Sequence, residues 1–365
     1  PTKIARIRSS AYLNQESLFA RNSLPIDRLI HPEQVVTGQI RDILDHPGAL
    51  EVLDFADGRV QLVAMKAYAD GPLIGRALNV LPQHMPKVDA RVAAIFRNGQ
   101  PIIPEGNTVI EVDDEVFFIA ARKDINAVMS ELRKAEKPFK RIMIAGGGNI
   151  GARLAASIEG QYTTKVLEQS KARSMVLAEI LDTTVVINGS ATDRDLLLEE
   201  NIEECDVFCA VTNDDEVNIM SALMAKRLGV RQVISLIAKP AYLDLVQGGE
   251  IDLAISPQQA TIGTLLSHVR RADVARVHSL RRGAAEAMEA IAHGDVKTSK
   301  VVGRRLSEID LPDGTTIGAI VRDEEVLIAH HDVVIQPDDH VILFLVDKRQ
   351  IAAVERLFQV SLSFF

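Results

Sequence analysis

The residue pattern with the clearest chemistry is the glycine-rich segment 146–151, Gly-Gly-Gly-Asn-Ile-Gly, which has the spacing G-x-G-x-x-G. It follows the apolar run 141–145 and opens a segment, 149–159, in which apolar residues recur at helical spacing. Glu168 comes 20 residues after Gly148, at the end of the next apolar run. A glycine turn between a strand and a helix, followed by such an acidic residue, is typical of a dinucleotide-binding Rossmann unit.

Each glycine of this turn has its own physical purpose. Gly146 permits the tight turn, Gly148 lets the backbone approach a pyrophosphate, and Gly151 lets the helix pack closely on the sheet. The helix N-terminus adds free N–H groups and a partial positive charge that favour phosphates. Glu168 can accept hydrogen bonds from an adenosine ribose and would repel a 2′-phosphate. The alternative is a Rossmann-like sheet without a ligand. We favour nucleotide binding, with candidate contacts at Gly146, Gly147, Gly148, Asn149, Ile150 and Glu168.

Two further polar segments follow predicted strands, 188–193 after the third strand and 211–218 after the fourth. Ligands of open α/β sheets bind outside the carboxyl ends of the strands. We therefore expect Thr212 and Asn213 to line the same crevice. The pair Asp214-Asp215 has two interpretations, helix capping and ligand contact, and we favour capping because aspartate is preferred at helix N-termini.

The elements that position these residues alternate between strand and helix. Apolar runs and helical stripes follow one another from 141 to 237, which predicts a doubly wound parallel sheet. The stretches 50–121 and 274–346 differ, because short β-rich runs are separated there by turn signals and each stretch is followed by a helix. The predicted fold class is therefore α/β, a Rossmann-type sheet plus small β-rich α+β domains, tandemly repeated.

An internal repeat organises the chain at an offset of 225 to 230 residues. The matching segments are 11–13 with 241–243, 26–34 with 251–259, 71–78 with 299–306, and 113–118 with 338–343. The repeat predicts four parts: a remnant of a first nucleotide-binding domain (1–48), a first small domain (49–132), a second nucleotide-binding domain (139–272) and a second small domain (273–360). Segment 140–230 has no counterpart, so we expect about 90 residues with the first glycine loop to precede Pro1.

Composition argues against several functions. The net charge of −9, an aromatic content of 4% and the absence of tryptophan argue against nucleic-acid binding, which needs a basic surface or stacking platforms. No run approaches the roughly 18 apolar residues of a membrane-spanning helix. The segments 330–332 and 338–340, His-His-Asp and Asp-Asp-His, suggest metal ligands, but adjacent residues on a strand face opposite ways. We interpret them as polar turns, and predict no metal site and no catalytic residues.

The sequence resembles the RCK (KTN) family of potassium-transport regulators over essentially the whole chain. The resemblance is carried by segments 141–151, 210–216, 255–261 and 301–304. It implies a cytoplasmic protein, peripheral on the cytoplasmic side of the inner membrane, that forms a homo-oligomeric ring beneath a potassium-translocating membrane subunit. It also implies that the protein binds NAD(H), or alternatively ATP or ADP, and passes the nucleotide state to the pore.

The resemblance also assigns site residues. By this resemblance, the second site comprises Gly146–Ile150, Glu168, Thr212 and Asn213. A basic nucleotide contact of the first site falls on Arg6, whose equivalent in the second unit is Leu236. The resemblance therefore implies that the two sites are not chemically identical.

Two functions from different classes remain, a nonenzymatic regulatory subunit and an NAD-dependent oxidoreductase. A dehydrogenase needs an acid–base group facing the nicotinamide, and neither small domain shows one that both copies share. Duplication of a nucleotide-binding domain together with a small domain favours the regulator. The helices expected near 32–44 and 257–269 carry apolar stripes, which either join subunits or cover their own sheets.

Overall fold

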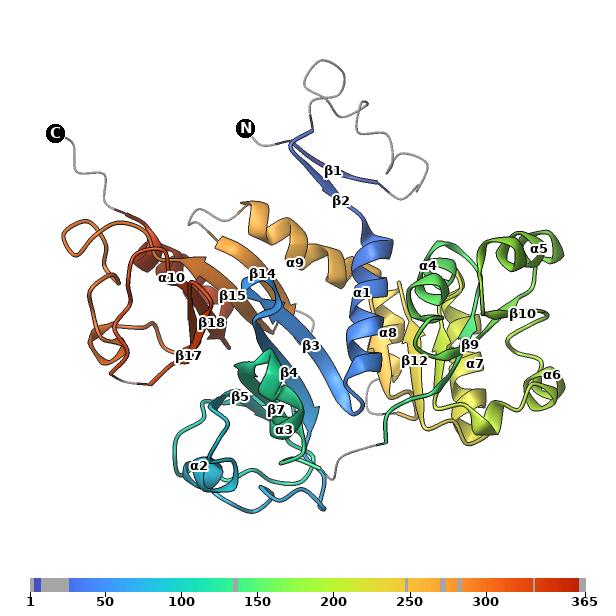
Figure 1. The fold of residues 1–365 in the computed structure, drawn as a ribbon, viewed down its shortest axis with the longest axis horizontal. Coiled ribbons are helices and arrows are strands. Elements are labelled where there is room, and N and C mark those ends of the chain that lie inside the picture. The colour runs from blue at the N-terminus through green and yellow to red at the C-terminus, as the bar shows by residue number, and fades with distance from the viewer. Residues whose placement is uncertain are drawn as a thin grey trace. The chain divides into compact units, whose positions relative to one another are not determined.

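The computed structural model describes residues 3–7, 26–133, 137–246, 249–269, 274–280, 284–330 and 332–360. The chain divides into two compact units. The first joins Pro1–Pro47 with Lys137–Thr261, and the second joins Gly48–Glu136 with Ile262–Phe365 (Figure 1). Within the described residues, no helix is both long enough and apolar enough to cross a bilayer.

The first unit contains a six-stranded parallel sheet in the order β10-β9-β8-β11-β12-β13. Its elements are β8 (Arg141–Ala145), α4 (Asn149–Ile158), β9 (Thr163–Glu168), α5 (Lys171–Ile180), β10 (Val185–Asn188), α6 (Arg194–Glu199), β11 (Val207–Ala210), α7 (Asp215–Arg227), β12 (Gln232–Leu236), α8 (Pro240–Val246) and β13 (Leu253–Ile255). The next helix, α9 (Pro257–Val269), begins in the first unit and continues into the second along the chain. The strand order reverses between β8 and β11, which is where open α/β sheets bind ligands. The predicted doubly wound sheet is confirmed.

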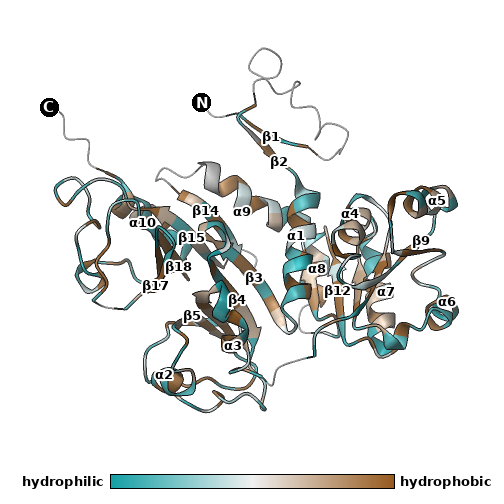
Figure 2. Cartoon of the chain, viewed as in Figure 1, coloured by the Kyte–Doolittle hydropathy of each residue, from teal (hydrophilic) through white to brown (hydrophobic). Residues whose placement is uncertain are grey.

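Capping residues begin three of these helices. The side chain of Ser170 accepts a hydrogen bond in the first turn of α5, Asp193 does so for α6, and Asp214 does so for α7. Each bond satisfies a backbone N–H group that has no partner within its helix. Figure 2 shows hydrophobic residues along the strands, and the outer helix α6 combines charged residues with leucines that pack against the core of this unit. Helix-capping residues and the hydropathy pattern together therefore account for the alternation of helices and strands in this unit.

A separate two-stranded parallel sheet precedes this domain along the chain. Its elements, with the helix that follows them, are β1 (Ile4–Arg6), β2 (Arg28–Ile30) and α1 (Pro32–Asp45). In the strand register Arg6 lies opposite Ile30, just as Leu236 lies opposite Ile255 in the pair β12–β13. The backbone thus repeats at the positions that the sequence aligned.

Helix α1 packs against α4 of the six-stranded domain (Figure 1). The Tyr162 hydroxyl, which lies just beyond α4, donates to Asp45 at the end of α1 at 2.9 Å. The apolar face of α1 is buried and consists of Val36, Ile40, Ile43 and Leu44. In this chain, therefore, the helix predicted near 32–44 covers the second nucleotide-binding domain. In α9, Ile262 and Leu265 remain exposed.

The second unit contains two five-stranded antiparallel sheets with the same topology. The first has the order β3-β4-β7-β5-β6 and the second the order β14-β15-β18-β16-β17. The first comprises β3 (Ala49–Phe55), β4 (Val60–Lys66), β5 (Ala90–Arg97), β6 (Gln100–Ile102) and β7 (Glu115–Ala121), with α2 (Leu81–His84) and α3 (Ile125–Met129). The second comprises β14 (Val274–Leu280), β15 (Ala285–Ile291), β16 (Thr315–Arg322), β17 (Glu325–Ile328) and β18 (His340–Leu345), with α10 (Ile351–Phe358). The tandem repeat of small β-rich domains is confirmed.

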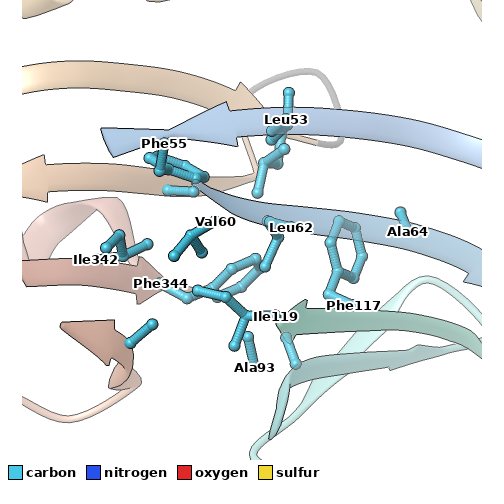
Figure 3. Close-up of a cluster of buried hydrophobic side chains, with 14 of the residues drawn as sticks. Leu53, Phe55, Val60, Leu62, Ala64, Ala93, Phe117, Ile119, Ile342 and Phe344 are labelled. Atoms are coloured by element: carbon cyan, nitrogen blue, oxygen red, sulfur yellow. The ribbon is translucent and has the colours of Figure 1, made fainter. Parts of the chain in front are cut away.

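Side chains from both sheets of this unit form one buried hydrophobic cluster, drawn in part in Figure 3. The rings of Phe117 and Phe344, one from each sheet, have centroids 5.4 Å apart. A Cβ atom on Gly318 would lie 2.9 Å from the side chain of Ile119, so the sheets are in close contact. Burial of this much apolar surface explains why the two small domains form one compact unit.

A buried ion pair occurs at equivalent positions of the two sheets. Arg97 donates two hydrogen bonds to Asp114, and Arg322 donates two to Asp339. Both carboxylates are fully buried, and each also accepts a backbone N–H from the turn that precedes it. The polar turn predicted at 338–340 is present at 337–338, and Asp339, which follows it, is buried. The sequence match between 113–114 and 338–339 arises because both sheets contain this Arg–Asp ion pair.

His278 makes the stability of the second unit dependent on pH. Its ring packs edge-on against Phe55 at 5.1 Å, and among the described residues its buried Nε2 atom has no hydrogen-bond partner. Burial, together with the charge of Arg276, lowers the pKa of His278 to about 4. The unfolded histidine binds its proton near pH 6.5, whereas the folded one does so only near pH 4. The free energy of unfolding of this unit should therefore fall by on the order of 2–3 kcal/mol as the pH falls from 6.5 to 4. Urea unfolding at several pH values measures this loss.

The matched comparison is His278→Phe, which keeps an aromatic ring against Phe55 and removes the titrating group. This variant should show a shallower fall in unfolding free energy between pH 6.5 and 4 than the wild type. His293→Phe changes a more exposed histidine of the same unit and serves as the control. An unchanged pH dependence in His278→Phe would show that other groups cause the acid sensitivity.

Candidate functional site

The glycine turn after β8 is held against the loop that follows β11. Gly146 has a φ of +105°, and a Cβ atom on it would lie 2.9 Å from the backbone N and Cα atoms of Thr212. A Cβ atom on Gly151 would lie 1.8 Å from the carbonyl oxygen of Gly146. Side chains are therefore excluded at both positions, at Gly146 also by the left-handed backbone. These contacts fix the shape of the turn at the reversal point of the sheet.

Gly148 differs from its neighbours because the space in front of it is open. It is the N-cap of α4, and a Cβ atom on it would meet no atom within 4 Å. No side chain caps this helix, so the N–H groups of its first turn, which begins with Asn149 and Ile150, are available to an anion. Open space in front of an uncapped helix N-terminus is what a pyrophosphate needs. The geometry fits the group that the sequence predicted there.

Glu168, at the end of β9, lies directly beside this turn. Its Oε2 atom accepts the N–H of Gly147 at 2.8 Å, and its Oε1 atom accepts the N–H of Ser170 at 2.7 Å. A carboxylate oxygen has two acceptor positions, so each of these oxygens keeps one for a ribose hydroxyl. The group is therefore held in place beside the glycine turn.

Thr212 forms the opposite wall, and its position is set by Asn218. The Thr212 N–H and hydroxyl both donate to Asn218 Oδ1, at 2.8 and 2.7 Å. The Asn218 amide nitrogen donates to the carbonyl oxygens of Thr212 and Leu236. Asn218 is only 1% exposed, so it is a buried bracket that joins the ends of β11 and β12. Asn213 follows Thr212 and is exposed.

The two aspartates after Asn213 have different partners. Asp214 caps α7 by accepting the N–H of Val217 at 2.9 Å, as the sequence predicted. Asp215 instead accepts the N–H groups of Ala238 and Lys239 in the loop after β12, at 2.9 and 2.8 Å. The capping interpretation is thus confirmed for Asp214. For Asp215 the structure shows a tie between the start of α7 and the loop after β12, at the carboxyl edge of the sheet.

A charged pair lies next to this tie. Lys239 donates to Glu216 at 2.8 Å, and Tyr242 donates to the same carboxylate oxygen at 2.7 Å. These bonds lower the pKa of Glu216 to about 2. Glu216 is therefore ionised at neutral pH and offsets the positive charge of Lys239 at this edge.

The structure brings most of the predicted residues to one edge of one sheet. Those at the carboxyl ends of β8, β9 and β11 are Gly146, Gly147, Gly148, Asn149, Ile150, Glu168, Thr212 and Asn213. Arg6 lies at the end of β1 in the separate two-stranded sheet, and its side chain is exposed. It was predicted as a contact of the first site, which is a different site. Leu236 occupies the equivalent place in the six-stranded sheet.

Two residues beside the site were missed by sequence reasoning. Asn218 lies on the buried face of α7, where its spacing from Ser221 and Ala222 gives a weak signal. Arg173 donates from Nε to the carbonyl oxygen of Gly147 at 2.8 Å. Nothing in the local pattern around Arg173 predicts this bond, because its partner is 26 positions away.

The described residues contain no group of three or more His, Cys, Asp or Glu side chains that could hold a metal ion. His330 contacts Asp89, and His340 contacts Glu289. His331 lies outside the described residues.

Comparison with known proteins places these observations in a family. The model of the TrkA-N domain matches residues 142–257, and that of the TrkA-C domain matches residues 62–133 and 295–359. The RCK domain of GsuK has a similar fold, with a TM-score of 0.55 and 16% identity over 98% of this chain and 75% of that chain. The GsuK channel bound to NAD gives a TM-score of 0.53 and 16% identity over 98% of this chain and 62% of that chain.

A curated relative extends the match to the whole sequence. The Trk system potassium uptake protein TrkA of Halomonas elongata is 65% identical over 365 residues, which is 100% of this chain and 80% of that protein. Two matches to the TrkA-C model, before and after the TrkA-N match, agree with the repeated sheets of the second unit. The chain therefore belongs to the TrkA family of Trk system potassium uptake proteins.

Proposed function

We propose that the chain is a nucleotide-binding regulatory subunit that gates a membrane potassium-uptake channel or transporter. Its partner is a potassium-translocating subunit of the TrkH/TrkG kind, and it works as a homo-oligomeric ring on the cytoplasmic side of the inner membrane. The observation that carries this proposal lies at the carboxyl ends of β8, β9 and β11. There, an uncapped helix N-terminus faces open space beside an oriented carboxylate, in a chain of the TrkA family.

The residues at this site fit NAD(H). The backbone from Gly146 to Ile150 would hold the phosphates, and Glu168 would hold the adenosine ribose. Thr212 and Asn213 would line the wall toward the second half of a dinucleotide. The solved GsuK channel bound to NAD shows that a protein of similar fold binds this cofactor. ATP or ADP shares the adenosine and phosphates and is the alternative ligand.

Binding alone is enough for the proposed role, since a ligand shifts an equilibrium by its difference in affinity for two conformations. The site meets α4, and the loops after β11 and β12 are joined by Asn218 and Asp215. A nucleotide bound at this site would therefore contact the loops after β11 and β12 and the start of α4, which packs on α1. We propose that this coupling carries the nucleotide state toward the membrane subunit.

The competing function is an NAD-dependent oxidoreductase. The small domains contain acid–base contacts, such as His340 with Glu289 and His84 with Glu131. These contacts do not repeat, since the position equivalent to His340 at the offset of 225 is Glu115. A duplicated catalytic pair would repeat, so we infer that these contacts are structural and that the chain catalyses no reaction.

Calorimetric titration of the purified chain with NAD, NADH, ATP, ADP and NADP tests the proposal. We expect saturable binding of NAD(H) or of the adenine nucleotides. A hydride-transfer assay against a panel of alcohols and hydroxy acids separates the two functions, because only the oxidoreductase would turn over a substrate. Absence of binding by every nucleotide would refute the regulatory proposal.

Glu168 should select against NADP(H). A 2′-phosphate would meet the carboxylate, whereas a 2′-hydroxyl donates to it, and a hydrogen bond to a charged group contributes about 1.5–3 kcal/mol. We therefore expect the wild type to bind NADH about tenfold or more tightly than NADPH. Glu168→Arg should remove or reverse this preference. Fluorescence titration of both proteins with both cofactors measures it, and equal wild-type affinities would mean that Glu168 does not face the ribose.

A further inference from the structure

Arg173, in the first turn of α5, shares a backbone contact with Glu168. Its Nε atom donates to the carbonyl oxygen of Gly147 at 2.8 Å, and the N–H of the same glycine donates to Glu168 Oε2 at 2.8 Å. Gly147 is thus held between a guanidinium and a carboxylate. The two charged groups face the glycine turn from β9 and α5, and both are half-buried.

Within the described part of the chain, no carboxylate offsets the charge of Arg173. A guanidinium has five N–H donors, and the described structure engages one of them, on a neutral carbonyl. Arg231, a half-buried arginine of the same domain, shows the usual arrangement: it lies 3.6 Å from Asp206 and stacks on Phe139. Among the described residues, no Asp or Glu oxygen lies within the 4.0 Å of an ion pair from Arg173. Arg173 is a half-buried cation at the proposed nucleotide turn, and the described structure shows no hydrogen bond from its two terminal nitrogens. Such a guanidinium fits an anionic group of the ligand.

The position of this cation identifies which part of the ligand it would meet. Glu168 faces the adenosine ribose in the proposed site. Arg173 and Glu168 both bind the backbone of the same residue, Gly147, so the cation lies near that ribose. The 2′-position of that ribose is where NADP(H) carries its additional phosphate. In Rossmann domains an arginine near the acidic residue accommodates this phosphate. Arg173 is placed to do so without any new side chain.

We propose that Glu168 and Arg173 form a pair with opposite preferences at the ribose 2′-position. Glu168 accepts the 2′-hydroxyl of NAD(H) and repels a 2′-phosphate. Arg173 is a specificity-determining cation that binds the 2′-phosphate of NADP(H) as soon as the charge of Glu168 is removed. This inference rests on the proposed nucleotide site. It implies that selectivity for NAD(H) depends on one carboxylate and that one substitution opens the site to NADP(H).

A double-mutant cycle tests the pair in the purified chain, with NADH and NADPH as fluorescent probes at one fixed salt concentration. The proteins are wild type, Glu168→Gln, Arg173→Gln and the double variant. Glutamine at 168 keeps the shape of the side chain and an acceptor oxygen for one of the two backbone N–H groups. Circular dichroism of each protein checks that the turn is still carried by a folded domain.

Glu168→Gln should bind NADPH about tenfold or more tightly than the wild type does. The double variant should show no such gain over Arg173→Gln alone, which is the reference for the lost bond to Gly147. As a matched control, Glu168→Gln combined with Arg194→Gln removes an exposed arginine at the start of α6 and should keep the gain.

The outcomes separate this inference from the proposed function. If Glu168→Gln binds NADH but gains no affinity for NADPH, or if the double variant keeps the full gain, Arg173 is not the 2′-phosphate cation. If the wild type binds neither NADH nor the adenine nucleotides, the proposed nucleotide site itself is wrong and the inference is overturned with it. A gain that requires Arg173 supports the pair.

Discussion

A Gly148→Val protein is expected to lose nucleotide binding, by about 100-fold or more, and to keep the thermal unfolding midpoint of the wild type. The expectation follows from the empty space in front of Gly148, where a Cβ atom meets nothing within 4 Å. A valine there costs the folded protein little, because its φ is ordinary for an L residue. Its branched side chain would occupy the path of the pyrophosphate. Calorimetric titration with NADH and a thermal melt measure the two halves of this prediction.

Two other glycines provide matched controls for the same substitution. Gly160, just beyond α4, also has no atom within 4 Å of its Cβ position, so Gly160→Val should bind nucleotide like the wild type. Gly151→Val should fail to fold, because its Cβ would lie 1.8 Å from the carbonyl oxygen of Gly146. A folded Gly148→Val that binds NADH with wild-type affinity would remove the phosphates from this turn.

The turn itself could be predicted because its signal is local. The glycine spacing, the preceding apolar run and Glu168 lie within 28 residues, and each obeys a rule of backbone conformation or strand–helix alternation. The repeat was equally visible, because equivalent turns need equivalent residues. The match between 113–118 and 338–343 reflects the buried pairs that Asp114 and Asp339 form with Arg97 and Arg322.

Contacts between distant segments had no such signal. Arg173 binds Gly147 from another helix, and Asn218 joins two strand ends through its amide group. In sequence both residues read as ordinary polar positions of amphipathic helices. The burial of Asp339 was not predicted for a related reason, since a carboxylate in a turn is usually solvated and only tertiary structure buries it against Arg322. The helix α1 was assigned to subunit contacts or its own sheet, whereas in the described chain it covers α4.

Potassium flux through vesicles that contain a TrkH-type membrane subunit should depend on this protein and on the nucleotide that it binds. A regulator that works by binding shifts a conformational equilibrium, and coupling free energies of about 1–3 kcal/mol correspond to roughly 5–150-fold changes in affinity. Flux should therefore respond to NADH, NAD, ATP or ADP when the wild type is present. It should lose this response with Gly148→Val and keep it with Gly160→Val. The flux assay thus uses the same pair of variants as the binding assay.

Linkage adds a quantitative requirement that a coincidental effect on flux would not meet. If nucleotide changes the affinity of the protein for the membrane subunit by some factor, the membrane subunit must change nucleotide affinity by the same factor. Titration of nucleotide with and without the solubilised membrane subunit, and of the membrane subunit with and without nucleotide, gives both factors independently. Equal factors, together with no hydride transfer to any substrate in the panel, support a switch. Flux that does not depend on the protein under any nucleotide condition contradicts the switch. In that case the nucleotide-binding protein has no effect on the pore.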